Sequence, residues 1–223
     1  MTTFPSPNFG ERRGGALPSL IVLHYTAMAS CAEARDRLCN PAHEVSAHWL
    51  ISEDGAAEAL VDEAQRAWHA GAGEWAGISD VNSHSIGIEL ANTGFQPFPE
   101  AQMAGLERVL AAVMVRWRIA PERLIAHSDM APARKSDPGA RFDWRRLALQ
   151  GISIWPDRRK ADLETLIPAL RRFGYPDARP ESLLRAFRLR VRPWAFGAPD
   201  QIDAGLAFSL AERCGVDRAP PAA

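Results

Sequence analysis

Short apolar runs alternate with amphipathic segments up to about residue 150, and this alternation limits the possible folds more than any other feature of the chain. Five runs rich in aliphatic or β-branched residues are typical of strands, at 19–24, 45–51, 59–61, 85–91 and 123–126. Apolar side chains at helical spacing predict a long helix over 100–118, and shorter helices are expected after Ser30 and near 143–149. The pattern predicts an α/β fold with a mixed central β-sheet flanked by helices.

The character of the chain changes after Trp155-Pro156. From there on only helical segments are predicted, at 161–173, 180–191 and 201–214, and Gly-Tyr-Pro and Gly-Ala-Pro separate them. We therefore predict two units, a domain over 1–160 and a small three-helix module over 161–223. The Pro/Ala-rich end of that module is expected to be a disordered tail.

Charge and composition exclude several classes of function. Lys and Arg number 26 against 27 Asp and Glu, a net charge of -1, whereas a protein that binds nucleic acid through long-range attraction normally carries a basic excess. No apolar stretch approaches the roughly 18–20 residues of a membrane span, and the first residues lack the basic and apolar regions of a secretory signal. Cys31, Cys39 and Cys214 form an odd, sparse set that argues against a disulfide framework. We expect a cytoplasmic protein, or a periplasmic one if a leader precedes this sequence.

Two histidines stand at the ends of predicted strands. His24 ends the first apolar run and His127 follows the last one. Glu89 lies near the end of a third run, where it must point away from the face formed by Ile86, Ile88 and Leu90. In open α/β sheets the carboxyl ends of strands are where ligands collect. Asp137 follows His127 by ten positions, in a loop rich in Pro, Gly and Asp.

These residue types suit a catalytic metal site. Two imidazoles and one carboxylate leave the fourth tetrahedral position of Zn²⁺ to water, whereas a structural zinc needs four close ligands, usually cysteines at CxxC spacing. Glu89 is a suitable general base for a water activated by zinc, and Lys135 can present an ammonium to an oxyanion. Spacing alone does not group these residues, because they are scattered from residue 24 to residue 137.

Six short blocks of sequence carry a more specific signal. They are Leu23-His-Tyr-Thr26, the segments 45–51, 67–71 and 82–92, His127-Ser-Asp129, and Arg134-Lys-Ser-Asp-Pro-Gly139 with Phe142 and Trp144 after it. In this order they resemble the type 2 N-acetylmuramoyl-L-alanine amidases, the AmpD/AmiD-like zinc amidases, over roughly residues 17–156. The resemblance implies the fold that these enzymes share with lysozyme-type phage amidases and peptidoglycan-recognition proteins.

By this resemblance His24, His127 and Asp137 correspond to the zinc ligands, Glu89 to the catalytic carboxylate and Lys135 to the cation that stabilises the transition state. The implied reaction is hydrolysis of the amide between the lactyl group of N-acetylmuramic acid and L-Ala of the stem peptide, in peptidoglycan turnover or recycling. We further expect substrate contacts at Tyr25, His69, Trp75 and Asn92. His69 could also stand behind the site, and Trp75, in a glycine-containing loop, could stack on a sugar or cover the cleft.

The C-terminal segment has a weaker resemblance. Gly174-Tyr175-Pro176 and the segment 186–193 are similar to the helical peptidoglycan-binding-like module of AmiD-like enzymes. The chain departs from that pattern, with Arg188 in place of the usual Gln and Arg190-Val191 in place of a His-Phe pair. The resemblance therefore implies a helical fold for the module but not the binding of sugar or peptide by it.

Alternative functions stay open at this point. A non-catalytic peptidoglycan-recognition protein could share the fold, but such proteins typically lack one zinc ligand, and all three are present here with Glu89 and Lys135. A zinc carboxypeptidase acting on cell-wall peptides is the third possibility. The expected partner is a muropeptide or peptidoglycan, either polymeric or as a 1,6-anhydro fragment, and the sequence makes no prediction of oligomeric state.

Overall fold

A six-stranded sheet forms the centre of the computed structural model, which describes residues 2–215. Its strands are β1 (Thr2–Thr3), β3 (Leu20–Tyr25), β4 (Trp49–Ile51), β5 (Ala57–Ala59), β7 (Ser85–Leu90) and β8 (Leu124–Ala126). They lie in the order β1-β5-β4-β7-β3-β8, and only β4 and β5 pair antiparallel. Two further strands, β2 (Phe9–Gly10) and β6 (Arg66–Ala67), form a separate antiparallel pair. The predicted mixed sheet is confirmed.

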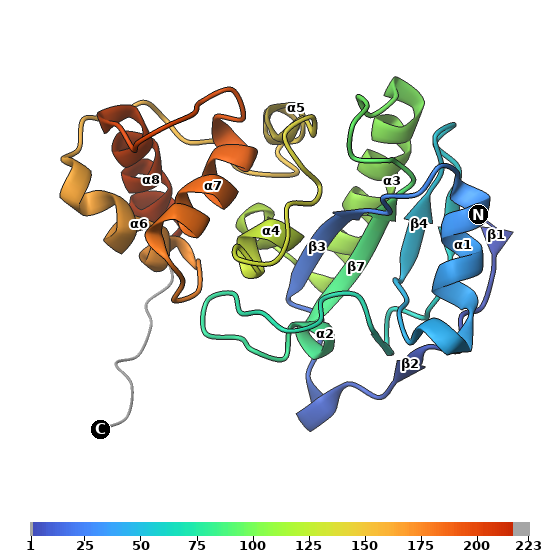
Figure 1. Ribbon diagram of the computed structural model, residues 1–223. Coiled ribbons are helices and arrows are strands. Elements are labelled where there is room, and N and C mark those ends of the chain that lie inside the picture. The colour runs from blue at the N-terminus through green and yellow to red at the C-terminus, as the bar shows by residue number, and fades with distance from the viewer. Residues whose placement is uncertain (1, 216–223) are drawn as a thin grey trace.

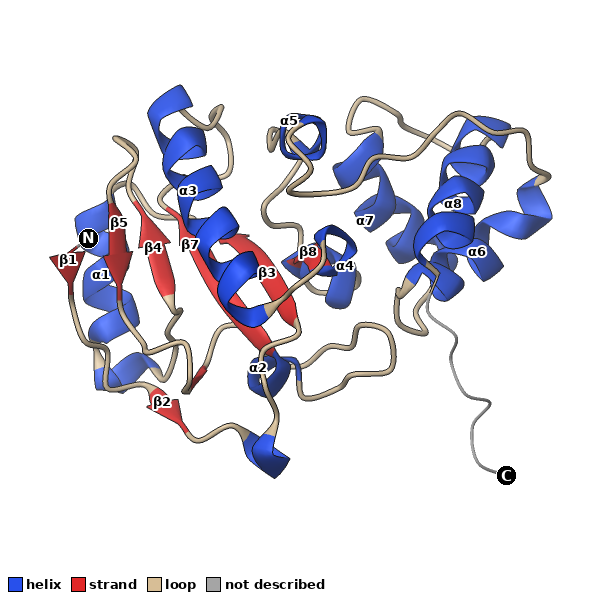
Figure 2. Ribbon diagram, turned by 180° about the vertical axis from the view of Figure 1, so that it is seen from behind, coloured by secondary structure: helices blue, strands red, loops and turns tan. Residues whose placement is uncertain are grey.

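The long helix α3 (Glu100–Trp117) covers one face of the sheet, as Figure 2 shows. Residues two apart in a strand share a side, so Ile86, Ile88 and Leu90 all face α3 and are buried with its Leu106 and Leu110. On the opposite face, helix α1 (Cys31–Cys39) packs its apolar side against β4, and the Ser30 side chain caps its first turn.

Three C-terminal helices, α6 (Leu166–Phe173), α7 (Pro180–Val191) and α8 (Gln201–Cys214), pack together at one end of the sheet, beyond α4 (His127–Met130) (Figure 1). One apolar cluster contains Phe187 of α7 and Leu210 of α8 together with Leu20 and Val22 of β3. The helices therefore share a core with the sheet, and the division of the chain at residue 160 stays a prediction.

Short elements complete the fold. They are α2 (Val81–His84), α5 (Trp144–Leu149) and the 3₁₀ turns η1 (Arg13–Gly15), η2 (Pro41–His43), η3 (Pro121–Arg123) and η4 (Leu163–Thr165). Among residues 2–215 no helix is long and apolar enough to cross a bilayer. The three cysteines are free thiols. The expected disordered tail lies outside the described residues.

Two predicted boundaries differ from the structure for local reasons. The strand expected from residue 45 begins at Trp49, because the Ser46 N–H bonds to the carbonyl of Trp68, in the loop after β6, and not to a neighbouring strand of the sheet. The helix expected from residue 161 begins at Leu166, which places Pro168 in the first turn. An earlier start would put Pro168 in the helix interior, where its missing N–H and its ring disrupt the backbone hydrogen bonds.

The shared core leads to a stability prediction. Phe187 is fully buried, so Phe187→Ala is expected to lower the free energy of unfolding by about 3–5 kcal/mol. Urea unfolding followed by tryptophan fluorescence and by far-UV circular dichroism checks it, and both probes should report one transition at a lower midpoint. Phe196→Ala, at an 88% exposed position, is the matched control and should leave the midpoint unchanged. Two separate transitions in the Phe187 variant would contradict a common core.

Candidate functional site

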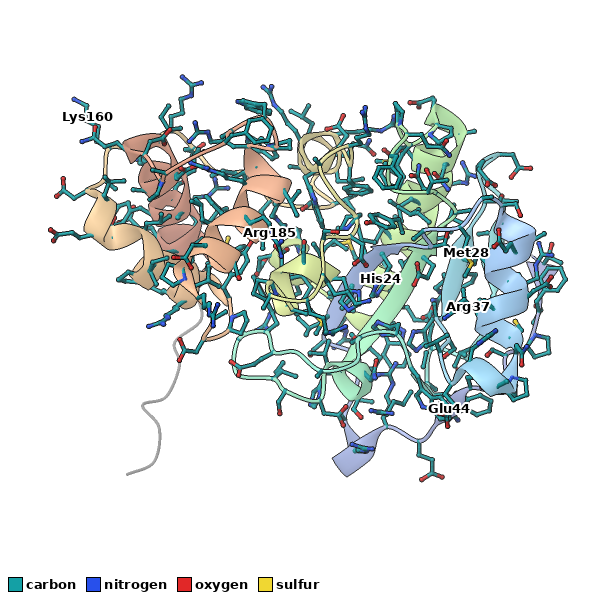
Figure 3. All side chains as sticks on the ribbon, in the orientation of Figure 1. His24, Met28, Arg37, Glu44, Lys160 and Arg185 are labelled. Carbon is teal, nitrogen blue, oxygen red and sulfur yellow. The ribbon has the colours of Figure 1, made fainter. Side chains whose placement is uncertain are left out.

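The site is built at the carboxyl ends of two neighbouring parallel strands. His24 of β3 is the registered partner of Glu89 of β7, so both side chains leave the sheet on the same side. That side is opposite to α3, because Leu23 and Ile88, next to them in their strands, face α3. Figure 3 labels His24 beside β3 and β7, near the middle of the molecule. The prediction that Glu89 points away from Ile86, Ile88 and Leu90 is confirmed.

The segment after β8 brings the other two predicted metal ligands to His24. His127 is the first residue of α4, and Asp137 follows in a loop. The backbone carbonyl of Asp137 accepts the N–H of Ser128 at 3.0 Å, which ties this loop to α4. The Nδ1 atoms of His24 and His127 lie 2.8 Å apart, and Asp137 Oδ2 lies 3.1 Å and 2.9 Å from them. All three residues are buried.

A chain of hydrogen bonds behind His24 determines which of its nitrogens carries the proton. The Ser85 hydroxyl donates to the carbonyl of Val81 at 2.6 Å, so its oxygen is left to accept from His69 Nε2 at 3.1 Å. His69 Nδ1 is then an acceptor, and His24 Nε2–H donates to it at 3.0 Å. His24 therefore presents an unprotonated Nδ1 to His127 and Asp137.

His127 is oriented in the same way by a backbone carbonyl. Its Nε2 lies 3.0 Å from the carbonyl oxygen of Ala70, which can only accept, so Nε2 carries the proton and Nδ1 does not. Arg134 donates to the same carbonyl at 2.8 Å and holds the loop in place. Both histidines thus offer Nδ1 as the ligand atom.

Three lone pairs consequently converge on one point, an arrangement that is repulsive unless a cation lies there. Burial, followed by the neighbouring His127, lowers the pKa of His24 to about 4, so the imidazole is neutral at pH 7, as a metal ligand must be. Ligand atoms about 2.0–2.1 Å from a tetrahedral zinc lie roughly 3.3 Å apart, close to the separations found here. The donor set of two nitrogens and one carboxylate oxygen fits a catalytic zinc.

Glu89 has a buried carboxylate oxygen beside these donors. Within residues 2–215, Oε2 of Glu89 has no hydrogen-bond partner, which is rare for a buried polar atom and marks a place for a ligand or water. Burial, and next the negative charge of Asp137, raise the pKa of Glu89 to about 8. A carboxyl group with this pKa is suited to exchanging protons near neutral pH.

A cavity of about 390 Å³ joins the three donors to Glu89 and Lys135. Tyr25 also lines it, with its hydroxyl 3.2 Å from that of Ser136. The α1 side of the cavity holds two residues that the sequence analysis missed, Arg37 and Met28, both labelled in Figure 3. Nothing in the sequence marks Arg37 of α1 or Met28 of the preceding loop, because only the packing of this segment against the sheet decides which of its residues border the cavity.

His69 lines the same cavity and stands behind His24. Its ring lies directly over Gly87 of β7, where a Cβ atom would approach the ring to 2.3 Å, so only glycine leaves room for it. The sequence left His69 open between a place at the rim and a place behind the site. The structure gives it both a hydrogen bond to His24 and a place in the cavity lining, so its role stays a prediction.

The structure corrects two expected substrate contacts. Trp75 is 1% exposed and packs edge-on against Phe173 and Tyr175 in the core shared with the C-terminal helices, so it cannot stack on a sugar. Asn92 is buried as well, and its side chain accepts the Gly94 N–H at 2.7 Å and donates to carbonyls of its own loop. Neither residue borders the cavity.

The raised pKa of Glu89 predicts a pH dependence for the metal-free protein. Between about pH 4.5 and pH 8 the folded chain keeps a proton that the unfolded chain releases, so the stability from this group is lost as pH rises. Chemical denaturation in chelator at several pH values checks this. The free energy of unfolding of Glu89→Gln relative to that of the wild type should rise by about 4 kcal/mol from pH 5 to pH 8.5. A difference that stays constant with pH would refute the assignment.

Comparison with known proteins agrees with the geometry. Residues 14–140 match the Amidase_2 family, described as N-acetylmuramoyl-L-alanine amidase. The chain is 35% identical to N-acetylmuramoyl-L-alanine amidase AmiD of Escherichia coli over 89% of its length and 84% of the relative's. It is 33% identical to 1,6-anhydro-N-acetylmuramyl-L-alanine amidase AmpD of Haemophilus influenzae, over 63% of this chain and 86% of the relative.

Two solved structures are similar to this chain over most of its length. The complex of E. coli AmiD with the substrate anhydro-N-acetylmuramic acid-L-Ala-D-γ-Glu-L-Lys has a TM-score of 0.82 at 32% identity and covers 94% of this chain and 99% of that one. AmpDh3 of Pseudomonas aeruginosa, in complex with anhydromuramic pentapeptide, has a TM-score of 0.81 at 31% identity over 91% and 94% of the two chains. The chain belongs to the Amidase_2 family of N-acetylmuramoyl-L-alanine amidases.

Proposed function

We propose that this chain is a zinc enzyme that hydrolyses the amide between the lactyl group of N-acetylmuramic acid, or its 1,6-anhydro form, and L-Ala of the stem peptide. The observation that carries the proposal is the convergence of three unprotonated donors beside a buried, unpartnered carboxylate oxygen in one cavity. The bound ligands of the AmiD and AmpDh3 structures support this substrate class.

Three residues would hold the metal. They are His24 and His127, each through Nδ1, and Asp137 through Oδ2. Zinc bound there would polarise a carbonyl and lower the pKa of water to about 7. The hydrogen bonds from His24 to His69 and from His127 to Ala70 keep both rings turned toward it.

Glu89 would carry the protons of the reaction. The positive charge of a zinc ion bound by His24, His127 and Asp137 would favour the carboxylate form of Glu89, which could then accept a proton from the attacking water. The oxygen of that water would add to the amide carbonyl carbon, and Glu89 would pass the proton to the nitrogen of L-Ala as the C–N bond breaks. The products are the lactyl carboxylate and a peptide with a free amino terminus.

The cations that border the cavity would bind charge on the substrate. Lys135 would stabilise the oxyanion of the tetrahedral intermediate, and its place in the lining of the same cavity as Glu89 and the three proposed ligands supports this role. Tyr25, which lines the cavity, would contact the substrate, while His69 would act through His24.

The cellular setting is part of the proposal. Free thiols at all three cysteines are in keeping with a reducing compartment, and we propose that the enzyme acts in the cytoplasm on recycled muropeptides. In this proposal residues 1–160 form the catalytic domain, and the C-terminal module stabilises that domain by packing against it.

Incubation with two substrates tests the activity. The zinc-loaded chain should release an intact stem peptide with a free L-Ala amino group from 1,6-anhydromuropeptide, faster than from intact sacculi. A strong chelator should abolish turnover and added zinc should restore it, as analysis of the products by mass spectrometry can show. Release of D-Ala instead would indicate a carboxypeptidase. Tight binding without any product would indicate a recognition protein.

Replacement of Glu89 separates metal binding from turnover. Glu89→Ala should keep its zinc, because Glu89 is not among the ligands, and should lose about 10²–10⁴-fold in kcat, the usual contribution of a general acid–base. Zinc content by atomic emission and initial rates on the same preparation check both halves. Glu212→Ala, an exposed change in α8, is the control that should affect neither. Wild-type turnover in Glu89→Ala would overturn the assigned role.

A further inference from the structure

Helix α7 of the C-terminal module reaches the segment that carries two of the three metal ligands. This segment runs from His127 in α4 to Asp137, and Figure 1 shows α7 beside α4. Two arginines of α7, Arg190 and Arg185, bond to it directly. Figure 3 labels Arg185 just above α4.

Arg190 is buried among partners that all belong to the sheet domain. Its Nη1 donates to Asp129 at 2.8 Å, and the exposure of the two side chains is 1% and 0%. Its Nη2 donates to the carbonyl of Leu124 in β8 and to the hydroxyl of Ser153. The guanidinium also lies 4.1 Å from the ring centre of Trp144. Because water does not reach this position, loss of one partner would leave a buried charge unpaired, so the guanidinium keeps a fixed position among these groups.

Asp129 connects Arg190 to the metal ligand. Its Oδ2 accepts the N–H of Ala126, the residue before His127, at 2.9 Å, and so fixes the first turn of α4. Its Oδ1 accepts from the hydroxyl of Tyr175, another residue of the C-terminal module, at 2.6 Å. His127 therefore lies between two residues, Ala126 and Asp129, that this network joins.

Two further contacts tie the module to the loops around the ligands. Arg185 donates to the carbonyl of Pro132 at 2.9 Å, in the stretch that leads to Lys135 and Asp137. The carbonyl of Gly174 accepts the N–H of Ala76 at 2.8 Å, in the loop whose Ala70 carbonyl orients His127. The module thus contacts both segments that determine where His127 Nδ1 points.

We propose that Arg190, together with Tyr175, is a positioning residue of the metal centre: through Asp129 it holds α4 so that His127 Nδ1 meets His24 and Asp137. The C-terminal module is then a support of the catalytic centre in this chain. The inference rests on the proposed zinc site. It also explains what Arg190 does in a module whose sequence departs from the peptidoglycan-binding pattern at this position.

The same helix offers a matched control. Arg188 of α7 is also buried in an ion pair, but its partner is Asp203 of α8, and its other bonds go to the carbonyls of Gly197 and Ala198. All of these partners lie inside the module. Loss of Arg188 therefore removes a comparable buried charge pair without touching α4.

The experiment compares Arg190→Met, Tyr175→Phe and Arg188→Met in the full chain. Zinc affinity is measured by competition with a chromogenic chelator, the geometry of the ligands by the visible spectrum of the cobalt-substituted protein, and turnover by kcat and KM on 1,6-anhydromuropeptide. Arg190→Met should weaken zinc binding by about 10–100-fold, the usual effect of losing a group that orients a metal ligand. Its cobalt spectrum should change, and kcat should fall with little change in KM.

The other two variants complete the test. Tyr175→Phe removes only one hydroxyl and should move zinc affinity in the same direction by a smaller factor, so it decides the matter if Arg190→Met does not fold. Arg188→Met should lower the melting temperature while zinc affinity and the cobalt spectrum stay those of the wild type.

Two results would overturn the inference. One is wild-type zinc affinity in folded Arg190→Met or Tyr175→Phe, and the other is an equal loss of affinity in Arg188→Met. If the wild type binds zinc and turns over substrate in these experiments, the proposed function stands and only the positioning role fails. A wild type that binds no zinc would refute the metal centre itself, and the positioning role with it.

Discussion

Three unprotonated donor atoms held within about 3 Å of one another are the arrangement on which this structure depends. Such lone pairs repel, and the chain keeps them together because each ring has its other nitrogen committed elsewhere, His24 to His69 and His127 to the Ala70 carbonyl. The packing and hydrogen bonds around the site hold the donors together despite this repulsion. A cation that binds between the donors removes the repulsion, so holding the donors in place raises the affinity for the cation.

The sheet and the C-terminal module contribute differently to the position of these three donor atoms. The parallel strands β3 and β7 place His24 and Glu89 side by side through their register alone. His127 and Asp137 lie on a short helix and a loop, which the pairing of strands does not position. There the C-terminal module supplies buried contacts through Arg190 of α7 and Tyr175 of the loop before it. Trp75, in the shared core between the two parts, belongs to this support and not to the substrate cavity.

Periodicity and strand ends made much of this fold and site predictable. The alternation in β7 correctly turned Glu89 away from α3, and the helical spacing over 100–118 correctly predicted α3. The grouping of His24, His127 and Asp137 needed a resemblance to known amidases, since ligands so far apart in sequence meet only in three dimensions. The bond from His69 to His24, the burial of Trp75 and Asn92, and the place of Arg37 were not predictable. They depend on which loops and helices pack together. The sequence around each of these residues is the same whether its side chain is buried in the core or borders the cavity.

X-ray absorption spectroscopy of the zinc-loaded chain tests the central claim most directly, because it reports the atoms that surround the ion. The account predicts one zinc per chain with a first shell of nitrogen and oxygen only, at about 2.0–2.1 Å, including the outer-shell scattering of two imidazoles. A shell that contains sulfur at about 2.3 Å, or zinc bound without imidazole, would contradict it.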